Sequence, residues 1–489
     1  MKYSSVDYRR DEISRQVRQQ GRLLVMLTAC SRASRPFRRA LSTKAAAAEV
    51  AELGAAAGCK FFQFSFIDLF GVQRSKLVPA SRVREVAAGG AGFAGFAAHL
   101  DLEPTDGDLL ALPDPSSFVP LPWKPEVGWL ACDLVLNDAE LPHGPRNVLR
   151  RTQAALKEEC GVVLKTGVEC EFFLLDASTP SVGDVYDTQA KPCYDAHALM
   201  RRYELISTLS EHMEAMGWGP YQADHEDANG QFEINWDFDD AMRTADRMVF
   251  FKYMARTLAE AHGLRASFMP KPFAQLTGSG CHVHLSLHDL ALGSNVCGGG
   301  GTGVYGLGPK GLAFLGGVME HAPAMTAITN PTVNSYKRLN AQTTLSGATW
   351  SPNAVTWSGN NRTSLVRVPG GAPRMELRLA DMAANAYLLP AAIGAAGLTG
   401  LKGEAPLPPP PHDVNLYVPH RPEVAAVLAS ATKLPPNLYA ALQALDKSTA
   451  LRAGLGDSLV DAYLKLRGAH WQNYSSHLSQ WELDNYIDC

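Results

Sequence analysis

Four short segments of the sequence alternate apolar residues with charged or metal-binding ones. They read VECEFFLL (168–175), GQFEINW (230–236), CHVHLSL (281–287) and RMELRL (374–379). Side chains two residues apart on a strand point to the same face. An ordinary solvated face would also carry Lys, Thr and Ser, whereas these faces carry Glu, His, Arg and Asn. Repeated inward carboxylates and imidazoles need a metal or an ion pair to compensate them, so the sequence predicts a metal-binding sheet face.

The polar members of these segments are candidate metal ligands. Glu169 and Glu171 share one face of the first segment, and Glu233 lies on the second. At a spacing of roughly 6.5–7 Å along the strand, paired carboxylates can reach two metals or opposite sides of one. The other candidates come from the later strands and from the loop before the second strand: His282, His284, Glu376 and Glu226. Glutamate-rich ligation with an occasional imidazole favours a hard cation such as Mg²⁺ or Mn²⁺.

A basic region complements the acidic face. Residues 321–375 contain no Asp or Glu, yet they include Lys337, Arg338, Arg362, Arg367 and Arg374. A lone arginine is usually a partner in a surface salt bridge, but here acidic partners are missing locally. Guanidinium groups bind phosphates and carboxylates in a bidentate manner. Arginines beside a metal–carboxylate face are what phosphoryl transfer requires, so we expect anionic ligands here.

The remaining sequence indicates the elements that must position these groups. We expect a helix over residues 45–57, a strand and turn over 60–71, and a helix beginning at Pro145 close to a domain boundary. Further helices are expected over 241–262 and over 433–467, the latter broken near Gly454. The apolar run 388–401 is too short for a membrane span and reads as a buried helix. Strands and helices mix without a regular βαβ rhythm, which predicts an antiparallel α+β fold.

The first 44 residues differ from the rest of the chain. They hold eleven Lys or Arg against three acids, although the whole chain has a formal net charge of −4. A basic, acid-poor segment rich in Arg, Ser and Ala is typical of an organelle transit peptide, with a disordered basic tail as the alternative. We therefore expect a mitochondrial or plastid location if this head is a transit peptide, and a cytoplasmic one otherwise.

The overall composition excludes several classes of protein. The charge balance gives no indication of binding to nucleic acid or to a membrane surface. Nine cysteines without a CxxC pair favour reduced thiols and argue against a structural zinc site. The stretch 306–311 matches GxGxxG, but no hydrophobic strand precedes it and a proline lies inside it, so a dinucleotide site is not expected.

With these segments, the chain resembles the glutamine synthetase family. The matching stretches occur in the family's order: GVECEFFLL (167–175), ADHEDANGQFEI (223–234), FMPKPF (268–273), GSGCHVHLSL (278–287), NSYKRL (334–339), NNRTSLVRVP (360–369) and MELRLADMAANAYL (375–388). The run from NSYKRL to NNRT looks most like the type III branch, which includes glutamate–methylamine ligases. The resemblance implies a small β-grasp domain over residues 45–148 and a catalytic domain over 149–489. It also implies a homo-oligomeric ring, usually of twelve subunits, with active sites between neighbours.

The resemblance also implies an activity, in which ATP phosphorylates the γ-carboxylate of L-glutamate and ammonia or methylamine then displaces the phosphate. Two or three divalent cations, Mg²⁺ or Mn²⁺, would assist. One metal would be held by Glu171, Glu226 and Glu233, and another by Glu169, His282 and Glu376. ATP would be faced by His284, and the phosphates would be stabilised by Arg362, Arg367 and Arg374. Glutamate would be bound by Arg338, Arg378 and the backbone of Gly278.

Three departures from the family pattern concern the amine. The turn whose aspartate helps to bind ammonium reads Phe93-Ala94-Gly95-Phe96 here, and Thr277 replaces the Asn that usually precedes GSG. The flap, residues 339–361, contains no carboxylate. The aromatic residues of these segments would suit a methyl group if they line the entrance: Phe93, Phe96, Trp350 and Trp357. Three alternatives stay open: a ligase that uses methylamine, a ligase that uses ammonia with Asp101 or Glu103 in the acidic role, and a non-catalytic structural protein. Tyr417 matches a position modified in some bacterial relatives, but the match is too short to predict modification.

Overall fold

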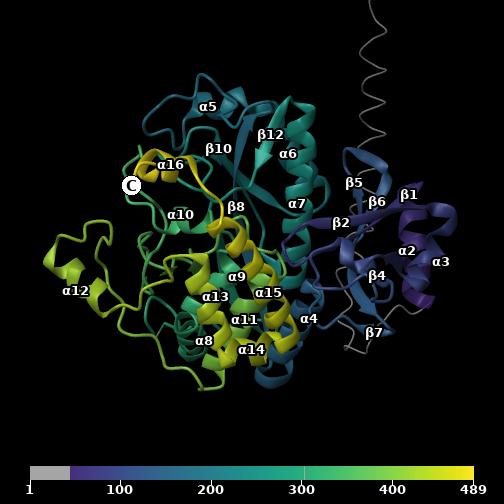
Figure 1. Cartoon of the computed structure of the whole chain (residues 1–489). Coiled ribbons are helices and arrows are strands. Elements are labelled where there is room, and N and C mark those ends of the chain that lie inside the picture. Colours follow the sequence, from purple (N-terminus) through teal and green to yellow (C-terminus); the bar gives the residue numbers. More distant parts are fainter. Residues whose placement is uncertain (1–43, 302) are drawn as a thin grey trace, which may run out of the picture.

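The computed structural model describes residues 44–301 and 303–489, so the targeting prediction for the basic head lies outside the described residues. Two sheets organise this part of the chain (Figure 1). A smaller one is built from residues before α4 (Pro145–Cys160), and a larger one from residues after it. The fold is mixed α+β, as predicted. None of the described helices is long and apolar enough to cross a membrane.

The smaller sheet has seven strands, in the order β2-β1-β6-β4-β3, with β5 and β7 also paired to β6. Its strands are β1 (Phe61–Ile67), β2 (Gln73–Pro79), β3 (Ala91–Phe93), β4 (Leu109–Pro113), β5 (Val119–Leu121), β6 (Lys124–Leu136) and β7 (Ala139–Glu140). The pair β1–β6 is parallel and the other pairs are antiparallel. Helices α2 (Lys44–Ala57) and α3 (Val83–Gly89) belong to the same part of the chain. The helix predicted over residues 45–57 and the strand predicted over 60–71 are therefore confirmed.

The larger sheet contains all four segments that carry the candidate ligands. Its path is β14-β15-β16-β13-β8-β10-β9, and only β14–β15 is parallel. The four segments become β8 (Val162–Asp176), β10 (Gln231–Trp236), β13 (Cys281–Asp289) and β16 (Met375–Leu377). The other strands are β9 (Pro220–His225), β11 (Asp239–Asp240), β12 (Leu264–Ser267), β14 (Trp357–Ser358) and β15 (Val366–Arg367). The four segments are therefore consecutive neighbours, although up to about 200 residues separate them in sequence.

Helices pack on and around the larger sheet. They are α5 (Ala196–Arg201), α6 (Tyr203–Ala215), α7 (Ala241–Ala261), α8 (Pro309–Glu320), α9 (Ala322–Thr329), α10 (Ser335–Leu339), α11 (Leu388–Leu401), α12 (Pro422–Ser430), α13 (Leu438–Lys447), α14 (Thr449–Leu455), α15 (Asp457–Ser475) and α16 (Gln480–Tyr486). Helix α11 is buried almost throughout, as predicted. A Cβ atom at Gly400 would collide with the backbone of α8, so a glycine there lets the two helices approach closely.

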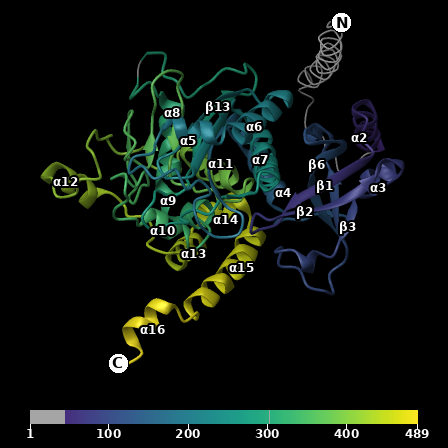
Figure 2. The same ribbon diagram turned by 90° about the horizontal axis from the view of Figure 1, so that it is seen from above.

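The C-terminal helical region is more divided than the sequence indicated. The chain breaks at Ser448 and at Gly456, whose φ of +94° favours glycine, while Gly454 lies inside α14 against Ala395 of α11. Figure 2 shows α15 and α16 extending away from the rest of the protein toward the C-terminus. The end of this arm exposes Leu478 and Ile487 to solvent.

A buried arginine joins the two sheets. Arg146, at the start of α4, is 4% exposed and binds Asp133 at 2.7 Å and Asp114 at 2.9 Å, both from the N-terminal part. Its Nε and Nη2, the latter shared with Asp114, each lie 3.0 Å from a carboxylate oxygen of Asp246 in α7, which also accepts a hydrogen bond from Tyr387. Although burial opposes it, Arg146 lowers the pKa of Asp114. The network fixes α4 and the smaller sheet onto α7.

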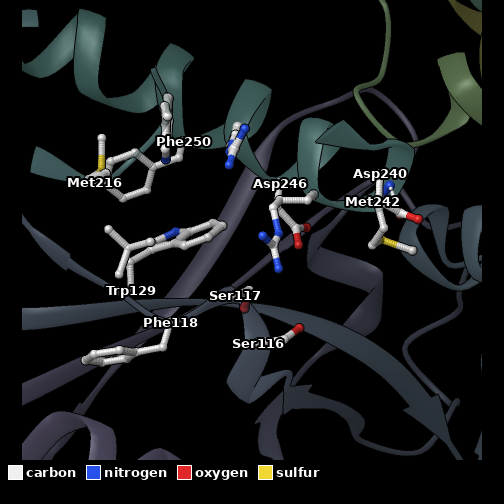
Figure 3. Close-up of a pocket in the computed structure, with 13 residues that line it drawn as sticks. Ser116, Ser117, Phe118, Trp129, Met216, Asp240, Met242, Asp246 and Phe250 are labelled. Atoms are coloured by element: carbon white, nitrogen blue, oxygen red, sulfur yellow. Dashed lines mark hydrogen bonds between the residues drawn. The ribbon is translucent and has the colours of Figure 1, made fainter. Parts of the chain in front are cut away.

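A cavity of about 270 Å³ lies next to this network, between the same two parts of the chain. Figure 3 shows Trp129 of β6, and Phe118 just before β5, on the opposite side of the cavity from Asp246 and Phe250 of α7. Trp129 and Phe250 make an edge-to-face contact with ring centroids 5.3 Å apart. The contact between the two parts thus combines aromatic packing with buried ion pairs.

Replacing the central arginine should loosen this contact. We expect Arg146→Ala to reduce the free energy of unfolding by about 3–5 kcal/mol, because it leaves buried carboxylates without their cation. Denaturant unfolding followed by fluorescence measures the change. The control is Arg82→Ala, which removes the exposed pair with Glu85 and should change stability by about 0–1 kcal/mol. Equal effects of the two substitutions would contradict the structural role of Arg146.

Candidate active site

The register of the larger sheet brings the candidate ligands face to face. Glu169 of β8 is paired with His282 of β13, and His284 of β13 is paired with Glu376 of β16. On the other side of β8, Glu171 is paired with Glu233 of β10. Side chains directly opposite on neighbouring strands are close enough to share one ion. The sheet face predicted from the alternation is therefore present.

Glu171, Glu226 and Glu233 form the first cluster. Each offers a carboxylate oxygen within 4.8 Å of the others, and Glu171 and Glu233 are 5% and 6% exposed. Burial, and then the neighbouring Glu171, raises the pKa of Glu226 well above its usual value. Burial, and then Glu169 and the other glutamates, raises the pKa of Glu233 in the same way. Three mutually repelling oxygen ligands fit a hard divalent cation, which would relieve that repulsion.

Glu169, His284 and Glu376 form the second cluster, with ligand atoms again within 4.8 Å. His282, which the resemblance assigned to this metal, lies 3.0 Å from Glu169 and 3.7 Å from Glu376 through its Nδ1. Its Nε2 is buried and has no hydrogen-bond partner among the described residues. Hydrogen bonds from both imidazoles lower the pKa of Glu169 in spite of its burial. Both histidines thus lie at this cluster, and their division between metal and ATP stays a prediction.

The candidate arginines surround the second cluster. Arg367 and Arg378 bind opposite oxygens of Glu376, at 2.6 Å and 2.5 Å. Arg374 donates through Nε to Nδ1 of His284, at 3.2 Å. Arg367 of the acid-free region therefore has an acidic partner from a later strand, which the local sequence did not reveal. Burial opposes ionisation of Glu376, but Arg378 and then the imidazoles lower its pKa to about 2.

A cavity of about 390 Å³ opens beside the second cluster. Glu169 and His284 line it together with the basic side chains Arg362, Arg367 and Arg374. Tyr221 and Phe238 also line it and offer aromatic surface. Cations at one end and aromatic rings nearby suit the phosphates and the base of a nucleotide.

Two of the predicted glutamate-binding residues, Arg338 and Gly278, lie next to each other. Arg338 is 2% exposed and donates to the carbonyl of Leu379, 3.1 Å away. A Cβ atom at Gly278 would lie 3.1 Å from the Arg338 side chain, so the two residues are in contact. The sequence analysis missed Lys271, which is 6% exposed, donates through Nζ to the carbonyl of Leu276, and has its pKa lowered to about 8 by burial and Arg338. Its position in FMPKPF was the available signal.

Two acidic residues near the first cluster were also missed. Asp224 of β9 is paired with Glu233, and burial, followed by Glu171 and Glu169, raises the pKa of Asp224 to about 6. Asp227 directly follows Glu226 and is 8% exposed. Its carboxylate accepts hydrogen bonds from Thr277, at 2.6 Å, and from Ser346 of the flap. Nothing in the local sequence distinguishes these acids from ordinary loop residues.

The aromatic residues proposed for the amine entrance are separated in the structure. Trp357 is 2% exposed and donates to the carbonyl of Pro409, so it belongs to the core and cannot line an entrance. Phe93 packs on Phe66 of the smaller sheet, while Phe96 is 62% exposed. Trp350 alone lies beside the site within this chain, because Arg378 contacts its carbonyl at 3.5 Å.

Comparison with known proteins identifies the fold. The family model for the glutamine synthetase catalytic domain matches residues 142–486, which is more than half of the chain. The chain belongs to the glutamine synthetase family. A glutamine synthetase of Rhizobium leguminosarum bv. phaseoli is 52% identical over 429 residues, covering 88% of this chain and 97% of that protein.

Two further similarities extend the comparison. A glutamate–methylamine ligase of Methyloversatilis universalis is 40% identical over 435 residues, covering 88% of this chain and 96% of that protein. A solved structure described as a GmaS/ADP complex superposes with a TM-score of 0.84 at 52% identity, covering 90% of this chain and 99% of that one. As a member of the glutamine synthetase family the chain is a ligase, and its relatives differ in the amine for which they are named.

The first cluster predicts a measurable dependence on a divalent cation. We expect Glu233→Gln to raise the Mg²⁺ concentration for half-maximal activity at least about tenfold, because one charged ligand is lost. In the unsubstituted protein, the raised pKa values of Glu226 and Glu233 mean that cation binding releases protons. The apparent affinity for Mg²⁺ should therefore increase as the pH rises toward and through those pKa values.

Mg²⁺ titrations of activity, and calorimetric titrations at two pH values, measure both effects. The matched control is Glu214→Gln, which changes an exposed glutamate on α6 and should leave the Mg²⁺ requirement unchanged. A normal requirement in Glu233→Gln would remove this residue from the metal site.

Proposed function

We propose that this protein joins a small amine to the γ-carboxylate of L-glutamate at the expense of ATP, through a γ-glutamyl phosphate. The observation that carries the proposal is the pair of carboxylate clusters on one sheet face, next to a cavity lined by Arg362, Arg367 and Arg374. A non-catalytic structural protein would have no use for buried, mutually repelling carboxylates, since each destabilises the fold without a cation. The clusters therefore support catalysis over a structural role.

Different residues would bind the two substrates of the first step. Arg338 and the Gly278 backbone would hold the amino-acid end of glutamate, and Arg367 and Arg374 would hold the phosphates of ATP. A γ-carboxylate oxygen then bonds to the γ-phosphorus, and the bond from that phosphorus to ADP breaks. Two or three Mg²⁺ or Mn²⁺ ions, when bound to the glutamate clusters, would neutralise phosphate charge.

In the second step, the nitrogen of the neutral amine bonds to the γ-carbon, the bond from that carbon to the phosphate oxygen breaks, and the leaving phosphate takes up the proton that the nitrogen loses. Excluding water matters here, because an acyl phosphate also reacts with water. The flap supports this role: Leu345 donates to the carbonyl of Gln275, at 3.0 Å, and Ser346 binds Asp227, so the flap closes over the end of the first cluster.

For the amine, we propose methylamine, with ammonia as the second candidate. The solved GmaS structure and the Rhizobium glutamine synthetase are equally identical to this chain, so identity alone does not choose between them. The acid-free flap favours a substrate that gains from apolar contact. Trp350, which packs edge-to-face with Tyr417 beside Arg378, offers such a contact.

We further propose that the protein acts as a homo-oligomer, and the family resemblance favours twelve subunits. Helix α16 extends from the rest of the protein and carries Trp481 and Tyr486, while Leu478 and Ile487 flank it; their exposed fractions range from 53% to 72%. An apolar, projecting arm of this kind needs a covering surface, and a second copy of the chain supplies one.

The amine is tested by comparing two substrates on one preparation. We expect kcat/KM for methylamine to equal or exceed that for ammonia, with ATP and glutamate saturating. Burial of a methyl group contributes about 0.8 kcal/mol and a cation–π contact about 1 kcal/mol, which together correspond to roughly twentyfold in specificity. A preference for ammonia above about tenfold would make the protein a glutamine synthetase in activity as well as in family.

A further inference from the structure

Any amine substrate of this enzyme arrives mainly as a cation, since alkylamines and ammonia are protonated at neutral pH. An ammonium group is bound best by a carboxylate, through charge-assisted hydrogen bonds. The flap provides no carboxylate between residues 339 and 361. A carboxylate that the flap touches is the natural candidate for the acidic partner.

Among the described residues, Asp227 is the acid whose carboxylate accepts a hydrogen bond from a flap side chain. Its Oδ2 accepts one hydrogen bond from Ser346 of the flap and another from Thr277, the residue before Gly278. Its backbone N–H donates to Oε2 of Glu226, 2.8 Å away. Asp227 thus lies where the flap, the first metal cluster and the glutamate-binding backbone meet.

The carboxylate of Asp227 is held in a fixed position. It belongs to the turn between β9 and β10, where Asp187 binds the backbone of Gly230 and the side chain of Asn229. Both hydroxyl donors converge on Oδ2, and among the described residues no hydrogen bond to Oδ1 is present. One oxygen therefore anchors the flap while the other stays available to a ligand.

A purely mechanical role would not require a charge at this position. The hydroxyls of Thr277 and Ser346 could be accepted equally well by the carbonyl oxygen of an asparagine. A buried carboxylate, by contrast, is unfavourable unless it is compensated, and the two neutral hydroxyls compensate it only in part. Lys271 donates to the backbone at Leu276, and no ion pair to Asp227 is formed among the described residues. A cationic substrate supplies the missing charge.

We propose that Asp227 binds the amine substrate as its ammonium ion beside the γ-carbon of the glutamyl group, where the ion gives one proton to Oδ1 before its nitrogen attacks that carbon. This proposal rests on the proposed ligase function and assigns one residue of its amine site. Thr277 and Ser346 act as positioning residues, because they orient the carboxylate and fasten the flap over it.

The test compares a cationic with a neutral nucleophile in full-length Asp227→Asn. Asparagine keeps the shape and can accept both hydroxyls, but it removes the charge. We expect KM for methylamine to rise about ten- to hundredfold, the effect of losing a hydrogen bond to a charged group. Hydroxylamine is neutral at neutral pH, so its kcat/KM should change less than about threefold. Formation of ADP from ATP and glutamate without amine should also be retained in a single turnover, because transfer of the phosphoryl group precedes attack by the amine.

The control is the double variant Thr277→Val/Ser346→Ala, which removes both hydroxyls and keeps the carboxylate. It should reduce the reactions with methylamine and hydroxylamine by the same factor and leave their ratio unchanged. Asp227→Ser removes the charge with a smaller side chain and gives a second measurement of that ratio.

Three outcomes would overturn the proposal: an unchanged KM for methylamine in Asp227→Asn, equal losses with both nucleophiles, or loss of single-turnover ADP formation without amine. The double variant showing the same change of ratio as Asp227→Asn would overturn it as well. Failure of the ligase function itself looks different, because the unsubstituted protein would then produce neither amide nor phosphate.

Discussion

Mutual repulsion among buried glutamates is the constraint on which the site depends. Five of them meet at one face of the larger sheet: Glu169, Glu171, Glu226, Glu233 and Glu376. In a medium of low dielectric constant, like charges at these distances repel strongly, and burial together with this repulsion raises the pKa values of Glu226 and Glu233. Such an arrangement persists only when rigid surroundings enforce it and a bound cation compensates it.

The strand order supplies that rigidity. Strand β8 lies between β10 and β13. Glu171 is paired with a residue of β10 and Glu169 with a residue of β13, so the two glutamates belong to different clusters although they are only two residues apart. A shift of one residue in either pairing would turn the ligands into the apolar layer. Beneath them, apolar residues of β8 such as Phe172 pack on Phe251 of α7, so the core resists that shift. Packing of the apolar face therefore determines where the charges stand.

Part of this site could be predicted from the sequence, because alternation has a period of two and strands preserve it. That rule alone predicts that the polar face of the sheet carries Glu169, Glu171, Glu233 and Glu376. The two histidines of β13 lie on the same face, so the rule could not distinguish His282 from His284. The rule says nothing about contacts between segments that lie far apart in the sequence. Arg378 and Arg367 find Glu376, and Trp357 enters the core, through pairings that only the folded chain defines. The α+β fold class could be predicted because it follows from the same pattern of strands and helices. The helix breaks at Ser448 and Gly456 could not be predicted, because they depend on how the helices pack.

The sheet and the flap are under different constraints, and this explains how relatives with one fold can be named for different amines. The sheet must hold glutamates and arginines at fixed separations, because phosphoryl transfer depends on the placement of charge. The flap contacts that framework through few groups, chiefly Ser346 on Asp227 and Leu345 on Gln275. A loop with few anchoring contacts tolerates substitution far better than a sheet with ligands on every second residue. Changes in the amine should therefore arise in the flap and in the turn beneath it, while the two carboxylate clusters stay constant.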